Sequence, residues 1–132
     1  MFSATVLEHF HNPRNVGPLE GATHEGIAGI PGDGPHMRLW LIVEGDRIKQ
    51  AAYETYGCPA ATASGSMLAA VVAGRTTEQA LLITPEDLMK LLGGLPDGKQ
   101  HCAELPIAAL RSALGNRIVN GGELDLQRRE LK

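Results

Sequence analysis

The stretch MRLWLIVEGDRIKQAAYETYG, residues 37–57, decides the fold. It holds two runs rich in β-branched, aliphatic and aromatic residues, 37–43 and 47–56, separated by Glu44-Gly45-Asp46. Two such runs around a short turn with glycine are typical of a β-hairpin. The Gly-rich segment that precedes the hairpin supplies a further run at 26–30. We therefore predict three antiparallel strands.

Beyond the hairpin the apolar pattern changes to a helical period. Pro59 suits the first position of a helix, because its missing N–H has no partner there in any case. The pattern then continues to Gly74, which ends the run. Pro106 is tolerated only in a first turn, so we expect the last helix to open between Cys102 and 104. The predicted helices are 3–10, 59–73, one opening at 76–78, one within 84–94, and a long C-terminal one ending at Gly115.

These elements predict an α+β fold: a small three-stranded antiparallel sheet with helices packed on one face, a short N-terminal helix and a long C-terminal helix. A chain of 132 residues favours a single domain, 1–132, with a polar C-terminal tail from about residue 116. Only five aromatic residues are present, so an aliphatic core is expected.

Composition excludes several classes of function. The net charge of −3 gives no basic footprint for nucleic acid or an anionic membrane. No apolar run approaches the roughly 18 residues of a membrane span, and the N-terminus lacks the pattern of a signal peptide. Two cysteines cannot form a disulfide-rich framework; one Cys58–Cys102 bridge stays open, but free thiols in the cytoplasm are the expectation.

The two cysteines fall at similar places, where a loop or strand leads into a helix. Backbone N–H groups and the helix dipole favour a thiolate there, so we expect a lowered pKa for Cys58 and Cys102. His101 precedes Cys102, and two sulfurs with one imidazole make three ligands of a tetrahedral site for a soft metal. The loop PGDGPH, residues 31–36, offers Asp33 or His36 as the fourth ligand. A buried, inert Cys58 is the alternative interpretation.

Three separated motifs resemble the IscU/NifU N-terminal type of iron–sulfur cluster scaffold. They are VLEHFHNPRNVG at 6–17, YETYGCPAATASGSML at 53–68 and HCAELPIAAL at 101–110, in the family's order and spacing. The resemblance covers almost the whole chain. It implies an α+β fold with a three-stranded antiparallel sheet, and a non-enzymatic role in assembling and transferring a transient [2Fe–2S] cluster.

Residue roles follow from the same resemblance. Cys58, His101 and Cys102 match three of the family's cluster or metal ligands, and Cys102 matches the cysteine that receives persulfide sulfur. The implied partners are a cysteine desulfurase and apo iron–sulfur acceptor proteins. LPDGK, residues 95–99, stands where the family has its Hsp70-type chaperone motif, but only Leu95, Pro96 and Lys99 match, which argues against chaperone dependence.

One family ligand is missing. The family's first-ligand loop reads Pro-x-Cys-Gly-Asp, and without gaps Asp33 falls on that cysteine and Pro35 on the aspartate. A two-residue insertion would instead place Pro31 on the cysteine and Asp33 on the aspartate. Carboxylate oxygen in place of sulfur should weaken retention of a cluster and raise its reduction potential.

Three hypotheses follow. The first is a scaffold that binds iron or a [2Fe–2S] cluster through Cys58, His101, Cys102 and Asp33. The second is a zinc- or iron-binding accessory protein, or a persulfide acceptor, that has lost cluster building, because Zn²⁺ accepts the same donors. The third is a thiol enzyme, for which the chain shows no positioned base.

Overall fold

The computed structural model describes residues 2–30 and 32–118. The elements are α1 (Ala4–His11), β1 (His24–Ala28), β2 (His36–Glu44), β3 (Arg47–Tyr56), α2 (Pro59–Val72), α3 (Thr77–Leu81), α4 (Pro85–Leu91) and α5 (His101–Leu114). The predicted single-domain organisation is not tested by these elements. The predicted polar tail from 116 lies, at 119–132, outside the described residues.

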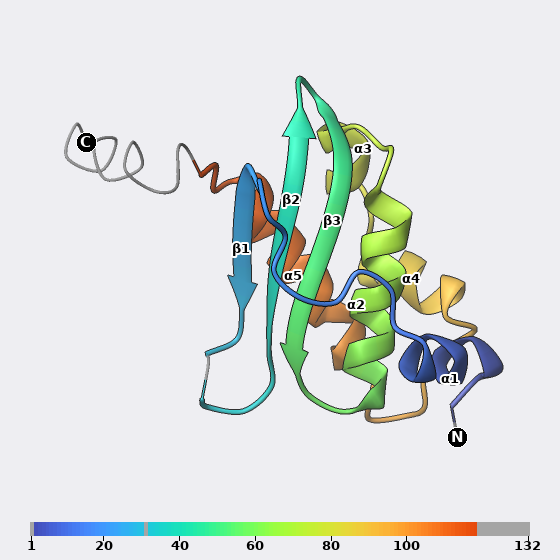
Figure 1. Ribbon diagram of the computed structural model, residues 1–132. Coiled ribbons are helices and arrows are strands. Elements are labelled where there is room, and N and C mark those ends of the chain that lie inside the picture. The colour runs from blue at the N-terminus through green and yellow to red at the C-terminus, as the bar shows by residue number, and fades with distance from the viewer. Residues whose placement is uncertain (1, 31, 119–132) are drawn as a thin grey trace.

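The three strands form one antiparallel sheet in the order β1-β2-β3, as predicted (Figure 1). Leu39 in the middle of β2 pairs with Gly26 on one side and with Tyr53 on the other. The register shifts once, between Ile42 and Val43 near the hairpin turn. β1 begins two residues earlier than the predicted strand and ends at Ala28.

The helices α2 and α5 lie side by side on one face of the sheet, which confirms the predicted α+β architecture (Figure 1). α5 packs against β1 and β2, α2 packs against β3, and α1 packs against α2. The connection from α1 to β1 crosses the opposite face. Six sheet side chains of the core are at most 1% exposed: Met37, Leu39, Leu41, Ile48, Ala51 and Tyr53. Tyr53 is thus an aromatic exception to the expected aliphatic core.

Two glycines set the distance between the helices and the sheet. A Cβ built on Gly26 would lie 2.2 Å from the backbone nitrogen of Ala113 and 2.4 Å from the carbonyl oxygen of Ala109, both in α5. A Cβ on Gly65 of α2 would lie 2.6 Å from the ring of Tyr53. Larger side chains at either position would push a helix away from the sheet.

The start of α5 differs from the sequence expectation. The helix begins at His101, so Pro106 lies inside it. The N–H groups of Cys102 and Ala103 donate to the carbonyls of Lys99 and Gln100, which closes a tight first turn ahead of the proline. Pro106 therefore removes only the later bond to the carbonyl of Cys102, and Pro106 itself is buried.

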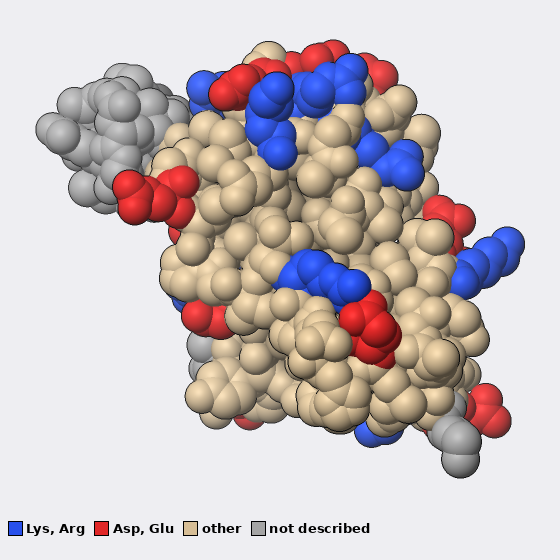
Figure 2. All heavy atoms as spheres, turned by 45° about the vertical axis from the view of Figure 1, so that its right-hand side comes forward, with Lys and Arg blue, Asp and Glu red and all other residues tan. Residues whose placement is uncertain are grey.

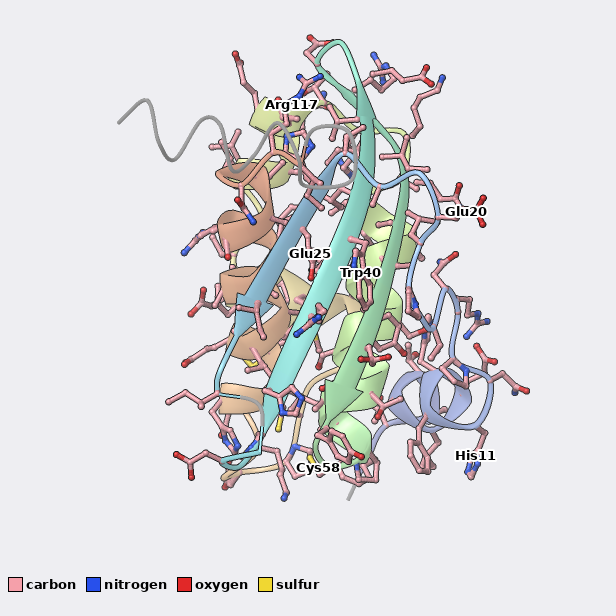
Figure 3. All side chains as sticks on the ribbon, turned by 60° about the vertical axis from the view of Figure 1, so that its left-hand side comes forward. His11, Glu20, Glu25, Trp40, Cys58 and Arg117 are labelled. Carbon is pink, nitrogen blue, oxygen red and sulfur yellow. The ribbon has the colours of Figure 1, made fainter. Side chains whose placement is uncertain are left out.

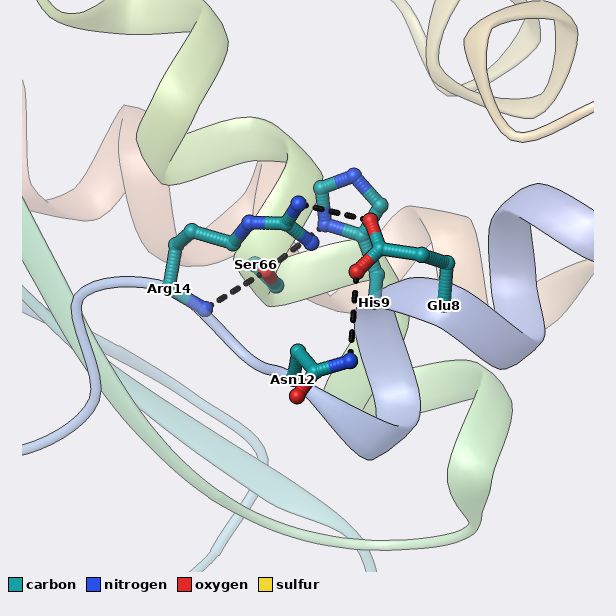
Figure 4. Close-up of polar contacts among 5 residues, drawn as sticks. All are labelled: Glu8, His9, Asn12, Arg14 and Ser66. Atoms are coloured by element: carbon teal, nitrogen blue, oxygen red, sulfur yellow. Dashed lines mark hydrogen bonds and ion pairs between the residues drawn. The ribbon is translucent and has the colours of Figure 1, made fainter.

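Side chains at the end of α1 and in the segment HNPRN, residues 11–15, hold α1 against α2. Ser66 of α2 accepts a hydrogen bond from the backbone N–H of Arg14 and contacts Nδ1 of His9 at 2.8 Å (Figure 4). Arg14 also pairs with Glu8 at 2.6 Å. His9 is buried, and a polar partner on the neighbouring helix makes its burial tolerable. These contacts hold the helix that begins next to Cys58.

The surface carries no single-sign patch on the face drawn in Figure 2. Side chains of both signs gather at the end that holds the β2–β3 turn, and the surface beyond them is mostly uncharged. None of the described helices is both long and apolar enough to cross a membrane.

Replacing Gly26 by alanine should destabilise the fold by about 3 kcal/mol, because the new Cβ overlaps backbone atoms of α5 rather than a flexible side chain. Urea unfolding measures the change. Gly115→Ala is the matched control: its φ is −91° and its nearest neighbours lie 3.7 and 3.8 Å away. That variant should stay within about 0.5 kcal/mol of the wild type, and an equal loss in both variants would contradict the packing argument.

Stability should fall as the pH drops from 7 to 5, partly through His9. Burial and then the Arg14 charge lower the pKa of His9, against an opposing effect of Glu8. The unfolded chain, whose histidines titrate at about 6.5, therefore binds the proton more readily than the folded one. Unfolding measured across this range should show a shallower loss for His9→Asn than for wild type. His11→Asn, at an exposed position on the same helix, should leave the slope unchanged.

Candidate functional site

Three segments meet at the end of the sheet opposite the β2–β3 turn. β3 ends at Tyr56, and Cys58 follows as the N-cap of α2 with Pro59 at the first helical position. α5 begins there with His101 and Cys102, and the loop between β1 and β2 reaches the same end. Figure 3 shows Cys58 just beyond the end of β3.

The two cysteine sulfurs lie 3.5 Å apart, so residues 44 positions apart in the chain share one place. Nε2 of His101 lies 3.6 Å from the sulfur of Cys102. Two thiolates on one tetrahedral ion are about 3.8 Å apart when each metal–sulfur bond is about 2.3 Å. The predicted meeting of Cys58 with the His101-Cys102 pair is confirmed, at nearly the spacing that a shared metal needs.

A pocket of about 150 Å³ opens at this point. Its lining residues come from the loop before β2, the β3–α2 junction and the start of α5: Pro35, Gly57, Cys58, Ala61, Lys99, His101, Cys102 and Leu105. Cys102 is 4% exposed, Cys58 is half-buried and His101 is exposed. One thiol therefore faces the opening while the other forms the inner wall.

Asp33, the predicted fourth ligand, does not line this pocket. Asp33 is exposed, and its N–H donates to the carbonyl of Ile30 in a turn. The neighbouring Pro35 lines the pocket instead. His36 packs on Tyr56 and lines a second pocket with Gly32 and Gly34, away from the cysteines. Among residues 2–30 and 32–118, no three His, Cys, Asp or Glu side chains are already arranged to hold a metal ion.

The two thiols differ in acidity because they face each other. Burial raises the pKa of Cys58, but the backbone N–H of Ala61, the thiol of Cys102 and the Lys99 charge together bring that pKa below its usual value. Burial, and then the neighbouring Cys58, raise the pKa of Cys102 to about 12. The expectation of a lowered pKa is confirmed for Cys58 and wrong for Cys102, since two adjacent thiols do not ionise together easily.

Lys99 is a site residue that the sequence reasoning did not identify. Its carbonyl accepts the N–H of Cys102, and its side chain lines the pocket. The Lys99 charge lowers the pKa of both thiols. The sequence did offer one signal for this role: Lys99 stands two residues before His101, in the loop that leads into α5.

Comparisons with known proteins place the whole described chain in one family. The profile of the NifU-like N-terminal domain family matches residues 1–118. The iron–sulfur cluster assembly scaffold protein IscU 1 of Archaeoglobus fulgidus is 41% identical over 95% of this chain and 82% of its own length. The iron–sulfur cluster assembly scaffold protein IscU of Aquifex aeolicus is 38% identical over 94% of this chain and 80% of its own length. A putative scaffold of the SUF system from Fervidobacterium islandicum superposes with a TM-score of 0.67 at 20% identity, covering 86% of this chain and 96% of its own, which shows the shared fold.

The two cysteine-to-alanine variants should shift the pKa of the remaining thiol in opposite directions. Cys102→Ala should raise the pKa of Cys58, because that thiol loses a hydrogen-bond donor. Cys58→Ala should bring the pKa of Cys102 below about 12, because the neighbouring charge is gone while burial persists. The pH dependence of iodoacetamide alkylation, followed by mass spectrometry, measures both. Shifts in the same direction would contradict the coupling.

Proposed function

The chain belongs to the NifU-like N-terminal domain family, and from that membership we propose that it is a scaffold for iron–sulfur cluster assembly. Its cargo is iron or a transient [2Fe–2S] cluster, which it hands to apo acceptor proteins. The observation that carries the proposal is the 3.5 Å contact of the Cys58 and Cys102 sulfurs in an open pocket. The names of the relatives, which are scaffold proteins, support it and favour a carrier rather than an enzyme.

The site suits stepwise loading. Cys58, with its lowered pKa, supplies the first thiolate at the pocket opening. A cation bound there favours ionisation of Cys102, because an adjacent positive charge stabilises the second thiolate. His101 supplies nitrogen from the same turn, and Lys99 offsets part of the negative charge of a thiolate-rich centre. Sulfur ligands match the softness of iron in such clusters.

Asp33 is the proposed fourth ligand. Its loop already borders the pocket through Pro35, so a local movement of this exposed segment would bring the carboxylate toward the sulfurs. Oxygen donates less charge to iron than thiolate does, so the cargo would be held more weakly than by three cysteines. Weak retention fits a protein that must release what it assembles.

A cysteine desulfurase is the proposed sulfur donor, with Cys102 as the persulfide acceptor. The Lys99 charge favours ionisation of Cys102, which gives its proton to solvent, and its sulfur then attacks the terminal sulfur of the donor persulfide. The donor's cysteine leaves as a thiolate. A reducing cytoplasm keeps both cysteines as free thiols. We propose no chaperone, nucleic-acid or membrane partner.

A zinc- or iron-binding accessory role is the second candidate. The donor set of two sulfurs, one imidazole and one carboxylate is a tetrahedral set that Zn²⁺ accepts without any cluster. Metal analysis of the protein as isolated distinguishes the two: zinc at one equivalent together with failure to build a cluster supports this role.

Anaerobic reconstitution with ferric iron and sulfide should give the visible absorption of a [2Fe–2S] centre. Cys58→Ala and Cys102→Ala should each abolish it, because one sulfur cannot replace two. Asp33→Ala should shorten the lifetime of the centre about tenfold, and Asp33→Cys should lengthen it, since thiolate binds iron more strongly than carboxylate.

Asp97→Ala, at another exposed acidic position in a loop, is the matched control and should behave as wild type. An unchanged lifetime in both Asp33 variants would remove Asp33 from the ligand set. Pro31→Cys tests the alternative alignment, which places residue 31 on the family's cysteine. If that alignment is correct, a cysteine at position 31 rather than 33 should prolong the lifetime of the centre.

A further inference from the structure

We infer that Cys58 and Cys102 form an intramolecular disulfide by exchange with small disulfides such as oxidised glutathione. The pocket would then carry a dithiol–disulfide couple in addition to its proposed cargo. The inference rests on the geometry of two free thiols and needs no metal.

The sulfurs are already close to bonding distance. They lie 3.5 Å apart, and a disulfide bond is about 2.05 Å long, so closure requires a movement of about 1.5 Å. Cys58 can supply that movement, because it precedes the first residue of α2 and is only half-buried. Cys102 lies within α5 and is fixed by burial. A rotation at Cys58 therefore closes the pair without breaking a helix.

Exposure sets the order of the chemical steps. The half-buried sulfur of Cys58 attacks one sulfur of the small disulfide, a new S–S bond forms, and one small thiolate leaves. Cys102 then gives up its proton and attacks the Cys58 sulfur of this mixed disulfide, and the second small thiolate leaves. The two protein thiols are oxidised, and one small disulfide is reduced to two thiols.

The pocket favours closure of the internal disulfide over a lasting glutathione adduct on Cys58. Its volume of about 150 Å³ is small beside a bound tripeptide, and Cys102 stands directly behind Cys58. Lys99 at the rim offers a positive charge to the carboxylates of oxidised glutathione and to the leaving thiolate. The second thiol therefore displaces the adduct as soon as it forms.

The consequence is an all-or-none change at the site. The chain has only two cysteines, so one disulfide removes every thiol from it. Loading and sulfur acceptance would stop together and return when a dithiol reductant restores the pair. This consequence rests on the proposed function; the disulfide itself does not.

The test is a redox titration of the metal-free, full-length protein in glutathione buffers. Free thiols are trapped by acid quenching and alkylation, and species are counted by intact mass. The folded protein should oxidise to the internal disulfide at about tenfold less oxidised glutathione than the same chain unfolded in urea, because folding raises the effective concentration of the pair. Equal midpoints, or a lasting glutathione adduct on folded wild type, would overturn the inference.

Two variants separate the steps. Cys102→Ser should accumulate one glutathione on Cys58, and Cys58→Ser should react at least about tenfold more slowly because Cys102 is buried. Similar rates in the two variants would contradict the order of attack. Iron and sulfide uptake by the reduced protein is measured in parallel. Uptake without a disulfide refutes this inference alone, and a disulfide without uptake refutes the proposed function alone.

Discussion

The contact between the sulfurs of Cys58 and Cys102 depends on how closely α2 and α5 pack against the sheet. Gly26 lets α5 approach β1 until backbone lies against backbone, and Gly65 lets α2 approach Tyr53. A methyl group at either glycine would push its helix away from the sheet. The sulfurs would then move apart by a distance comparable to that displacement. The chemistry at the end of the sheet is thus set by packing in its middle.

That contact also makes the two thiols unequal. One faces the opening with its pKa lowered, and the other is buried with its pKa raised to about 12. The lowered pKa of Cys58 comes first from the backbone N–H of Ala61 at the start of α2, with Cys102 adding to it. The raised pKa of Cys102 comes from burial and then from the neighbouring Cys58. The same inequality underlies both the proposed loading order and the proposed order of disulfide exchange. One physical contact thus supports two kinds of chemistry.

Much of the fold could be predicted from local signals. The turn at Glu44-Gly45-Asp46 and Pro59 at a helix start each act through backbone geometry within a few residues. The start of α5 was predicted to within one residue, but the restriction of Pro106 to a first turn was wrong, because inside the helix Pro106 removes only one hydrogen bond. The burial of His9 has no local signal, since its partner Ser66 lies 57 residues away.

The sequence alone determined the three strands and the order of the helices, and it singled out Cys58, His101 and Cys102 as the residues now proposed as ligands. Periodicity, turns and motifs record such properties locally. Only the tertiary structure decided that the sulfurs lie 3.5 Å apart, that Lys99 joins them, and that Pro35 rather than Asp33 lines the pocket. Distances between remote segments depend on how closely helices and sheet pack, and no local pattern encodes that spacing.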